Sequence, residues 1–261
     1  MKAILRRDLF LPAIGSLVAV AWLTLWVWER SPYGRYLSHA ELGHLALDGG
    51  ESSAVVQAGL YVVGWTVMTV AMMLPTTVPL IEIFRRMTRD HASRGQLVGA
   101  LVLGYLGIWL AFGVAAHVLD WGLHRLVHHS PWLHARSWLL GSGLLLLAGA
   151  FQFSSLKYRC LDECRSPLSF VIQHWQNRRG RLQALWLGVH HGLFCVGCCW
   201  ALMLLMFAVG TGNVGWMLLL GAVMAIEKNL PGGRRVAAPV GAVLMVWGIA
   251  IVLYHMRPWA V

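Results

Sequence analysis

The sequence predicts an all-α fold, a polytopic transmembrane helical bundle of about seven spans that forms a single integral membrane domain over residues 1–261. Hydrophobic residues make up 58% of the chain and charged residues only 12%, about half the charged share that is usual in soluble domains. The mean hydropathy is +0.62. Together with recurring long apolar runs, these values exclude a water-soluble single domain.

Seven apolar runs are long enough to cross the hydrocarbon core of a bilayer, which takes about 20 helical residues. They cover residues 10–28, 56–80, 97–119, 138–156, 183–209, 214–230 and 236–255. The first run follows basic residues, as a signal peptide does, but it is long and lacks a small-residue cleavage site, so we interpret it as a retained anchor. Pro75 and Pro79 are expected to kink the second run. Only residues 210–213 separate the fifth run from the sixth, which predicts a tight helical hairpin.

The basic residues predict the orientation of these spans. With seven crossings, sixteen of the 21 Lys and Arg residues fall on one side of the membrane and five on the other. Because cytoplasmic loops are enriched in Lys and Arg, we expect a cytoplasmic N-terminus and an external C-terminus. The whole formal net charge of +10 then lies on the cytoplasmic side. We therefore expect the lipid bilayer as a partner and no binding of nucleic acid.

The fifth run carries three of the five cysteines, Cys195, Cys198 and Cys199. At 100° per helical residue, their thiols occupy one arc of about 100°. Gly188 and Gly192 lie on the same face and form a small-xxx-small pair, which lets a neighbouring helix approach closely. The three thiols are therefore expected to point into protein.

His191 and Met206 fall within the same arc, whereas His190 falls on the opposite side of the helix. Thiolate and thioether groups favour Cu(I), and mixed thiolate and imidazole sets also suit Zn(II). The arc therefore predicts a soft-metal site, with Cu(I) favoured and zinc as the alternative. The simpler interpretation is that buried cysteines only fill space in the core.

The second cysteine pair, Cys160 and Cys164, follows the fourth run in the most basic loop. On a helix, thiols at i and i+4 lie on one side, about 5–6 Å apart at Cβ. We expect this pair at the cytoplasmic mouth of the bundle, where it would receive or release the ion. A reactive redox pair is the alternative, although a disulfide does not persist in a reducing cytosol.

Two further features lie inside the apolar runs. Met72 belongs to a methionine stripe beside the prolines of the second run, and it is a candidate auxiliary ligand together with His191. Glu227 and Lys228 end the sixth run, where they either extend to the cytoplasmic surface or have a structural or site role. The external loops hold a possible second metal-capturing group of histidines, namely His39, His44, His124, His128, His129 and His134.

Several of these stretches resemble the motifs of one family. They are Ala71-Met72-Met73-Leu74-Pro75, Gly104-Tyr105-Leu106, Leu156-Lys157 with Cys160-Leu161 and Cys164-Arg165-Ser166-Pro167, the run from Cys195 through Gly197, Cys198, Cys199 and Trp200 to Met203, Trp216-Met217, and Glu227-Lys228 with Pro231 and Gly233. The chain resembles a family of bacterial integral membrane proteins of unknown function that are described as predicted metal-binding, some of which are labelled copper chaperones. It departs from the family pattern at Ser154-Ser155, at Gly212 and at the acidic pair Asp162-Glu163.

The resemblance implies a bacterial inner-membrane protein that binds metal, with copper as the metal, and it implies no established reaction. We therefore expect a protein that chaperones, senses or translocates copper, with Cys195, Cys198 and Cys199 as primary ligands and a soluble protein that delivers the metal. The competing class is an enzyme, a membrane thiol–disulfide oxidoreductase that uses both cysteine clusters. A third class is a transporter of a small organic substrate, in which the thiols only pack.

Overall fold

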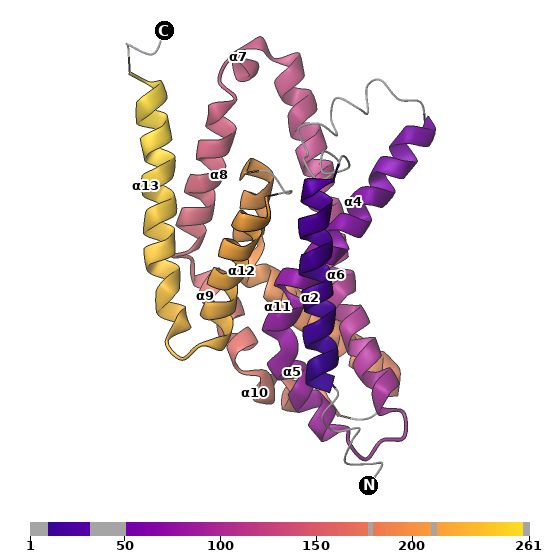
Figure 1. The fold of residues 1–261 in the computed structure, drawn as a ribbon. Coiled ribbons are helices and arrows are strands. Elements are labelled where there is room, and N and C mark those ends of the chain that lie inside the picture. Colours follow the sequence, from indigo (N-terminus) through magenta and orange to yellow (C-terminus); the bar gives the residue numbers. More distant parts are fainter. Residues whose placement is uncertain (1–9, 32–50, 177–179, 210–212, 258–261) are drawn as a thin grey trace.

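The computed structural model describes residues 10–31, 51–176, 180–209 and 213–257, and the regular elements in these ranges are all helical (Figure 1). In chain order they are α2 (Phe10–Arg30), α4 (Glu51–Met72), α5 (Leu74–Met87), α6 (Arg94–His129), α7 (Pro131–His134), α8 (Trp138–Phe151), α9 (Ser155–Arg165), α10 (Pro167–His174), α11 (Gly180–Val209), α12 (Val214–Asn229), η2 (Gly233–Val236) and α13 (Ala237–His255). The all-α class predicted from the sequence is confirmed.

The expectation of seven spans is not confirmed. Among the described residues, four helices are long and apolar enough to cross a membrane, and there are up to six such spans if each of two bent helix pairs counts as one. The bent pairs are α4 with α5 and α8 with α9. The first turn of α2 and the last turn of α13 lie at opposite ends of the bundle (Figure 1).

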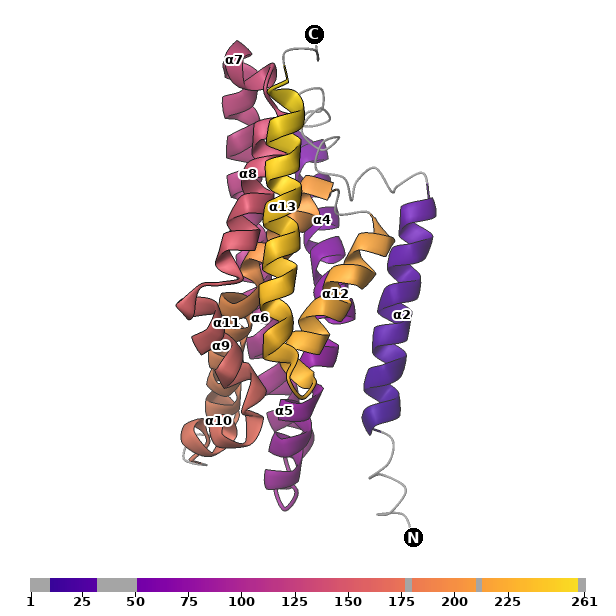
Figure 2. The ribbon, with the colours of Figure 1, turned by 90° about the vertical axis from the view of Figure 1, so that its left-hand side faces the viewer.

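Helix α12 falls short of a full span. It has 16 residues, and at 1.5 Å per residue it rises only about 24 Å, less than the roughly 30 Å core of a bilayer. Figure 2 shows it tilted relative to both α2 and α13. Of the tight turn expected before it, only Asn213 belongs to the described residues, and its side chain caps α12 by accepting a hydrogen bond from the backbone amide of Trp216 at 3.0 Å.

The predicted kink at the prolines of the second run is confirmed as a bend of 65° between α4 and α5. Helix α5 begins at Leu74, with Pro75 in its first turn, where the missing N–H of proline removes no intrahelical hydrogen bond. The carbonyl of Met73 at the bend accepts hydrogen bonds from the hydroxyls of Thr76 at 2.8 Å and Thr77 at 3.3 Å. The hydroxyl of Tyr105 on α6 donates to the same oxygen at 3.2 Å. The Met73 carbonyl at the bend therefore has its hydrogen-bond partners inside the protein.

A second bend, of 62°, separates α8 from α9. Ser154 caps α9 by accepting a hydrogen bond from the backbone amide of Lys157 at 3.1 Å. The bend turns α9 so that it packs against α11. The cysteine pair predicted on a helix after the fourth run is thereby placed beside the cysteines of the fifth.

Helices α6 and α11 approach each other closely at two glycines. A Cβ on Gly188 would overlap the carbonyl oxygen of Leu101, and a Cβ on Gly104 would overlap the carbonyl oxygen of Leu185. The close approach predicted from the small residues of the fifth run is therefore confirmed, and Gly104 is its counterpart on α6. The contact fixes the thiol-bearing face of α11 against α6.

Candidate metal-binding site

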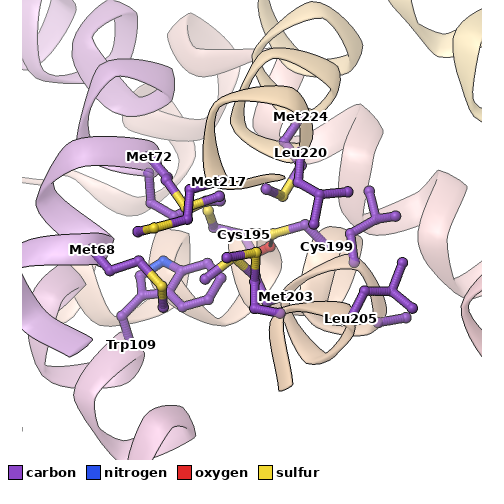
Figure 3. Packing of buried hydrophobic residues seen from close by; sticks show 14 of the residues in the cluster. Met68, Met72, Trp109, Cys195, Cys199, Met203, Leu205, Met217, Leu220 and Met224 are labelled. Carbon is purple, nitrogen blue, oxygen red and sulfur yellow. Dashed lines mark hydrogen bonds between the residues drawn. The ribbon is translucent and has the colours of Figure 1, made fainter. Parts of the chain in front are cut away.

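The three cysteines of α11 lie in the core of the bundle. Cys195, Cys198 and Cys199 are each 1% exposed, as expected from their common arc on the helix. Figure 3 shows methionine side chains gathered near Cys195 and Cys199, among them Met68, Met72, Met203, Met217 and Met224 from α4, α11 and α12. Met73 and Met206 belong to the same buried cluster. The region is thus a buried cluster of thiol and thioether sulfur.

Helix α9 adds its cysteines to this region. The thiol of Cys164 lies near those of Cys195 and Cys198. Cys160 packs directly against α11, where a Cβ on Gly197 would lie only 2.7 Å from its sulfur. The two clusters, separate in sequence, therefore form one group of sulfur side chains.

The thiols of α11 are arranged for hydrogen bonding. The Cys198 and Cys199 thiols both donate to the carbonyl of Cys195, at 3.1 Å and 2.7 Å respectively. Within the described ranges, no group of three or more His, Cys, Asp and Glu side chains is disposed to hold a metal ion. The five cysteines are free thiols.

Lys228 of α12 enters the sulfur group, so the alternative in which it extends to the cytoplasmic surface is wrong. The residue is 5% exposed. Its ammonium nitrogen lies 2.8 Å from Cys195 Sγ, 3.8 Å from Cys199 Sγ and 4.0 Å from Met73 Sδ. An unpaired charge is very costly in an apolar interior, and Cys195 Sγ is placed to carry the balancing negative charge as a thiolate.

Glu227, the neighbour of Lys228, pairs with a lysine from α9. Lys157 Nζ lies 2.7 Å from Glu227 Oε2, and the two side chains are 0% and 2% exposed. Lys157 also donates to the carbonyl of Cys198 at 3.2 Å. Arg165 donates to the carbonyls of Glu227 and Leu230. The ion pair therefore holds α9 and α12 against the thiol-bearing stretch of α11.

Tyr105 of α6 completes the surroundings of Cys195. Its hydroxyl lies 3.1 Å from Cys195 Sγ and also donates to the carbonyl of Met73. Tyr105 and Lys157 were not predicted as site residues. Each is a polar side chain within or directly beside an apolar run, and this position in the sequence could have marked it as a candidate. Whether such a residue belongs to a site depends on what it contacts in the folded chain.

His191 is buried, whereas His190 is exposed, as predicted from the helical arc. The His191 ring lies between Tyr105 and Phe170, with ring centroids at 5.8 Å and 5.5 Å. Its Nδ1 atom has no hydrogen-bond partner among the described residues. Tyr105 thus contacts both Cys195 Sγ and the His191 ring.

Met72 is 2% exposed and packs against Gly221 of α12. It therefore lies at the junction of α4 with the sulfur group.

The external histidines do not belong to the sulfur group as far as the structure describes them. His39 and His44 fall outside the described residues, as do the side chains of His124, His128 and His134, while His129 is exposed and contacts the carbonyl of Arg125 at 2.8 Å.

The fold and the site define a class: an all-helical protein with several helices that could span a membrane and a buried set of cysteine and methionine side chains. The chain belongs to the copper chaperone family PpoB2, whose model matches residues 62–251. The matched range contains the five cysteines together with Lys157, Glu227 and Lys228, and it confirms the family resemblance seen in the motifs. Neither a curated protein nor a solved structure gives a significant match to the chain.

Proposed function

We propose that this protein is an integral membrane protein that binds Cu(I) as its cargo through the cysteines of α11 and α9. The observation that carries the proposal is that Cys164 of α9 reaches Cys195 and Cys198 of α11 in a buried region that also holds seven methionines. Thiolate and thioether groups are the ligands that Cu(I) prefers, and mixed thiolate and imidazole sets would also accept Zn(II). The donor set therefore fits copper, with zinc as the second candidate.

Cys195, Cys198 and Cys199 are the primary ligands in this proposal. Cys160 and Cys164 receive or release the ion, and Met72 and His191 are auxiliary ligands. Because the Cys198 and Cys199 thiols donate to the Cys195 carbonyl in the structure, both must give up these hydrogen bonds to bind a metal. Binding as thiolates therefore releases the protons that make these bonds, within an already assembled group of helices.

We further propose that the chain lies in the bacterial inner membrane as a single domain, with a cytoplasmic N-terminus and an external C-terminus. The support is the distribution of Lys and Arg along the chain. In this orientation α9 belongs to the cytoplasmic side, where a soluble protein would deliver or collect copper. The family name supports a chaperone role, and translocation or sensing of copper would use the same ligands.

The proposal is tested by metal analysis of protein purified without chelator. The wild type should contain copper, and a triple variant with Cys195→Ser, Cys198→Ser and Cys199→Ser should lose it. His190→Ala, on the exposed side of the same helix, is the matched control and should keep the wild-type content. Equal copper and zinc contents in the wild type and the triple variant would refute the proposal.

A thiol–disulfide oxidoreductase remains the second candidate, and the contact of Cys164 with Cys195 and Cys198 favours it. In that reaction two thiols form one disulfide and pass two electrons and two protons to a quinone. Thiol trapping in intact cells separates the two functions. A Cys164 population that becomes oxidised when the quinone pool is oxidised supports the enzyme, whereas five thiols that stay reduced under both conditions support metal binding.

A further inference from the structure

The buried charges around the thiols do not cancel. Among the described residues the buried charged side chains are Lys157, Glu227 and Lys228. Lys157 and Glu227 neutralise each other at 2.7 Å, which leaves the positive charge of Lys228. That charge lies 2.8 Å from Cys195 Sγ and 3.8 Å from Cys199 Sγ. The sulfur group therefore contains one fixed cation in a region from which water is excluded.

From this charge balance we infer that Lys228 is the specificity-determining residue that makes the site select a monovalent soft cation over a divalent one. The inference rests on the proposed function, because it concerns the same thiols. The Lys228 ammonium places one positive charge beside whichever thiolates hold the ion. Its repulsion disfavours a divalent ion more strongly than a monovalent ion.

Coulomb's law gives the direction in which the Lys228 charge changes the relative affinity for divalent and monovalent ions. At any one position in the site, a divalent ion is repelled by the Lys228 ammonium twice as strongly as a monovalent ion is. Salt screens this repulsion much less than it would at the surface, because the groups are buried. The ratio of Zn(II) affinity to Cu(I) affinity should therefore depend on the charge at position 228.

The test measures both affinities in detergent-solubilised full-length protein, with a Cu(I)-selective chelator and a Zn(II)-selective chelator as competitors. Lys228→Met removes the charge and keeps the length of the side chain. With about 5 Å between the ion and the ammonium nitrogen and an effective dielectric constant near 20, the Zn(II)/Cu(I) affinity ratio should rise by roughly 250-fold. Lys228→Arg keeps the charge and should keep the wild-type ratio within about threefold.

A matched control separates local charge from general disturbance of the buried polar groups. The double variant Lys157→Met with Glu227→Gln removes one positive and one negative charge, so the net charge near the thiols is unchanged and the ratio should stay at the wild-type value. Met73→Glu offers an independent route, because Met73 Sδ lies 4.0 Å from the Lys228 nitrogen. A carboxylate there would cancel the charge of the ammonium and should raise the affinity ratio as Lys228→Met does. This variant therefore tests the inference even if Lys228→Met does not fold.

The possible outcomes are distinct. A ratio that changes less than threefold in folded Lys228→Met and Met73→Glu proteins, while the wild type binds Cu(I), would overturn the role of Lys228 and leave the proposed function standing. A wild type that binds neither metal would overturn both. A ratio that rises in these two variants and stays level in Lys228→Arg and in the double variant supports the inference.

Discussion

The crossing of α6 and α11 provides the sharpest test of how the site is held together. We predict that Gly188→Ala destabilises the protein by about 2–3 kcal/mol, the upper part of the range for overpacked cores. The added Cβ would overlap the Leu101 carbonyl oxygen and would lie 2.8 Å from the Leu101 carbonyl carbon and 3.0 Å from the Tyr105 amide nitrogen. All three are backbone atoms, so no rotamer change can relieve the overlap and the helices must separate.

The expected magnitude is a net value of two opposing effects. Alanine favours a helix over glycine by about 0.5–1 kcal/mol, and the overlap must exceed that gain. Gly107→Ala supplies the matched control, because Gly107 lies on α6 with open space around its Cβ position. This control should melt at the wild-type temperature or slightly above it.

Thermal unfolding in detergent, followed by circular dichroism, is the measurement. The Tyr105 hydroxyl lies 3.1 Å from Cys195 Sγ, and separation of α6 from α11 should move the two apart. The Cu(I) affinity should therefore fall together with the melting temperature. If Gly188→Ala melts as high as Gly107→Ala, the close crossing does not exist in the protein and the placement of the thiol face argued above is wrong.

Three further predictions follow from the same region. Glu227→Gln should destabilise the protein by about 3–5 kcal/mol, because it leaves Lys157 buried without its counter-charge, and adding Lys157→Met should recover most of that loss in a thermal melt. Tyr105→Phe should cost about 1 kcal/mol of stability, the usual value of one hydrogen bond; an unchanged melting temperature and unchanged Cu(I) affinity would contradict its contact with Cys195. Met72→Leu should change stability by less than about 1.5 kcal/mol yet weaken Cu(I) binding in chelator competition, and equal binding would exclude Met72 as a ligand.

Much of the fold could be predicted from the sequence because apolar runs and helical periodicity are local properties. The common face of the three α11 thiols, the burial of His191 and the close approach at Gly188 all follow from the 3.6-residue repeat. The sixth run, 214–230, closely matches α12 in its bounds, and Asn213 caps that helix. It is not confirmed as a full span, because a helix of 16 residues is shorter than the bilayer core.

The polar part of the site could not be predicted in the same way. Lys228 is 33 residues from Cys195 in the chain, and Glu227 is 70 residues from Lys157. Charges at the end of an apolar run fit a surface position and a buried pair equally well, and only packing distinguishes the two. The position of Cys164 depends on the bend between α8 and α9, which no proline within residues 138–165 marks.

The bend between α4 and α5 has a consequence for how relatives of this chain should be recognised. The hydroxyl groups of Thr76, Thr77 and Tyr105 donate hydrogen bonds to the Met73 carbonyl oxygen at the bend. Because three separate donors support it, the bend does not depend on Pro75 alone. A distant homologue could replace that proline and keep the same backbone, provided that it retained the hydroxyls. Search patterns that require the proline would miss such proteins, whereas patterns that pair the two threonines with a tyrosine on the next helix would find them.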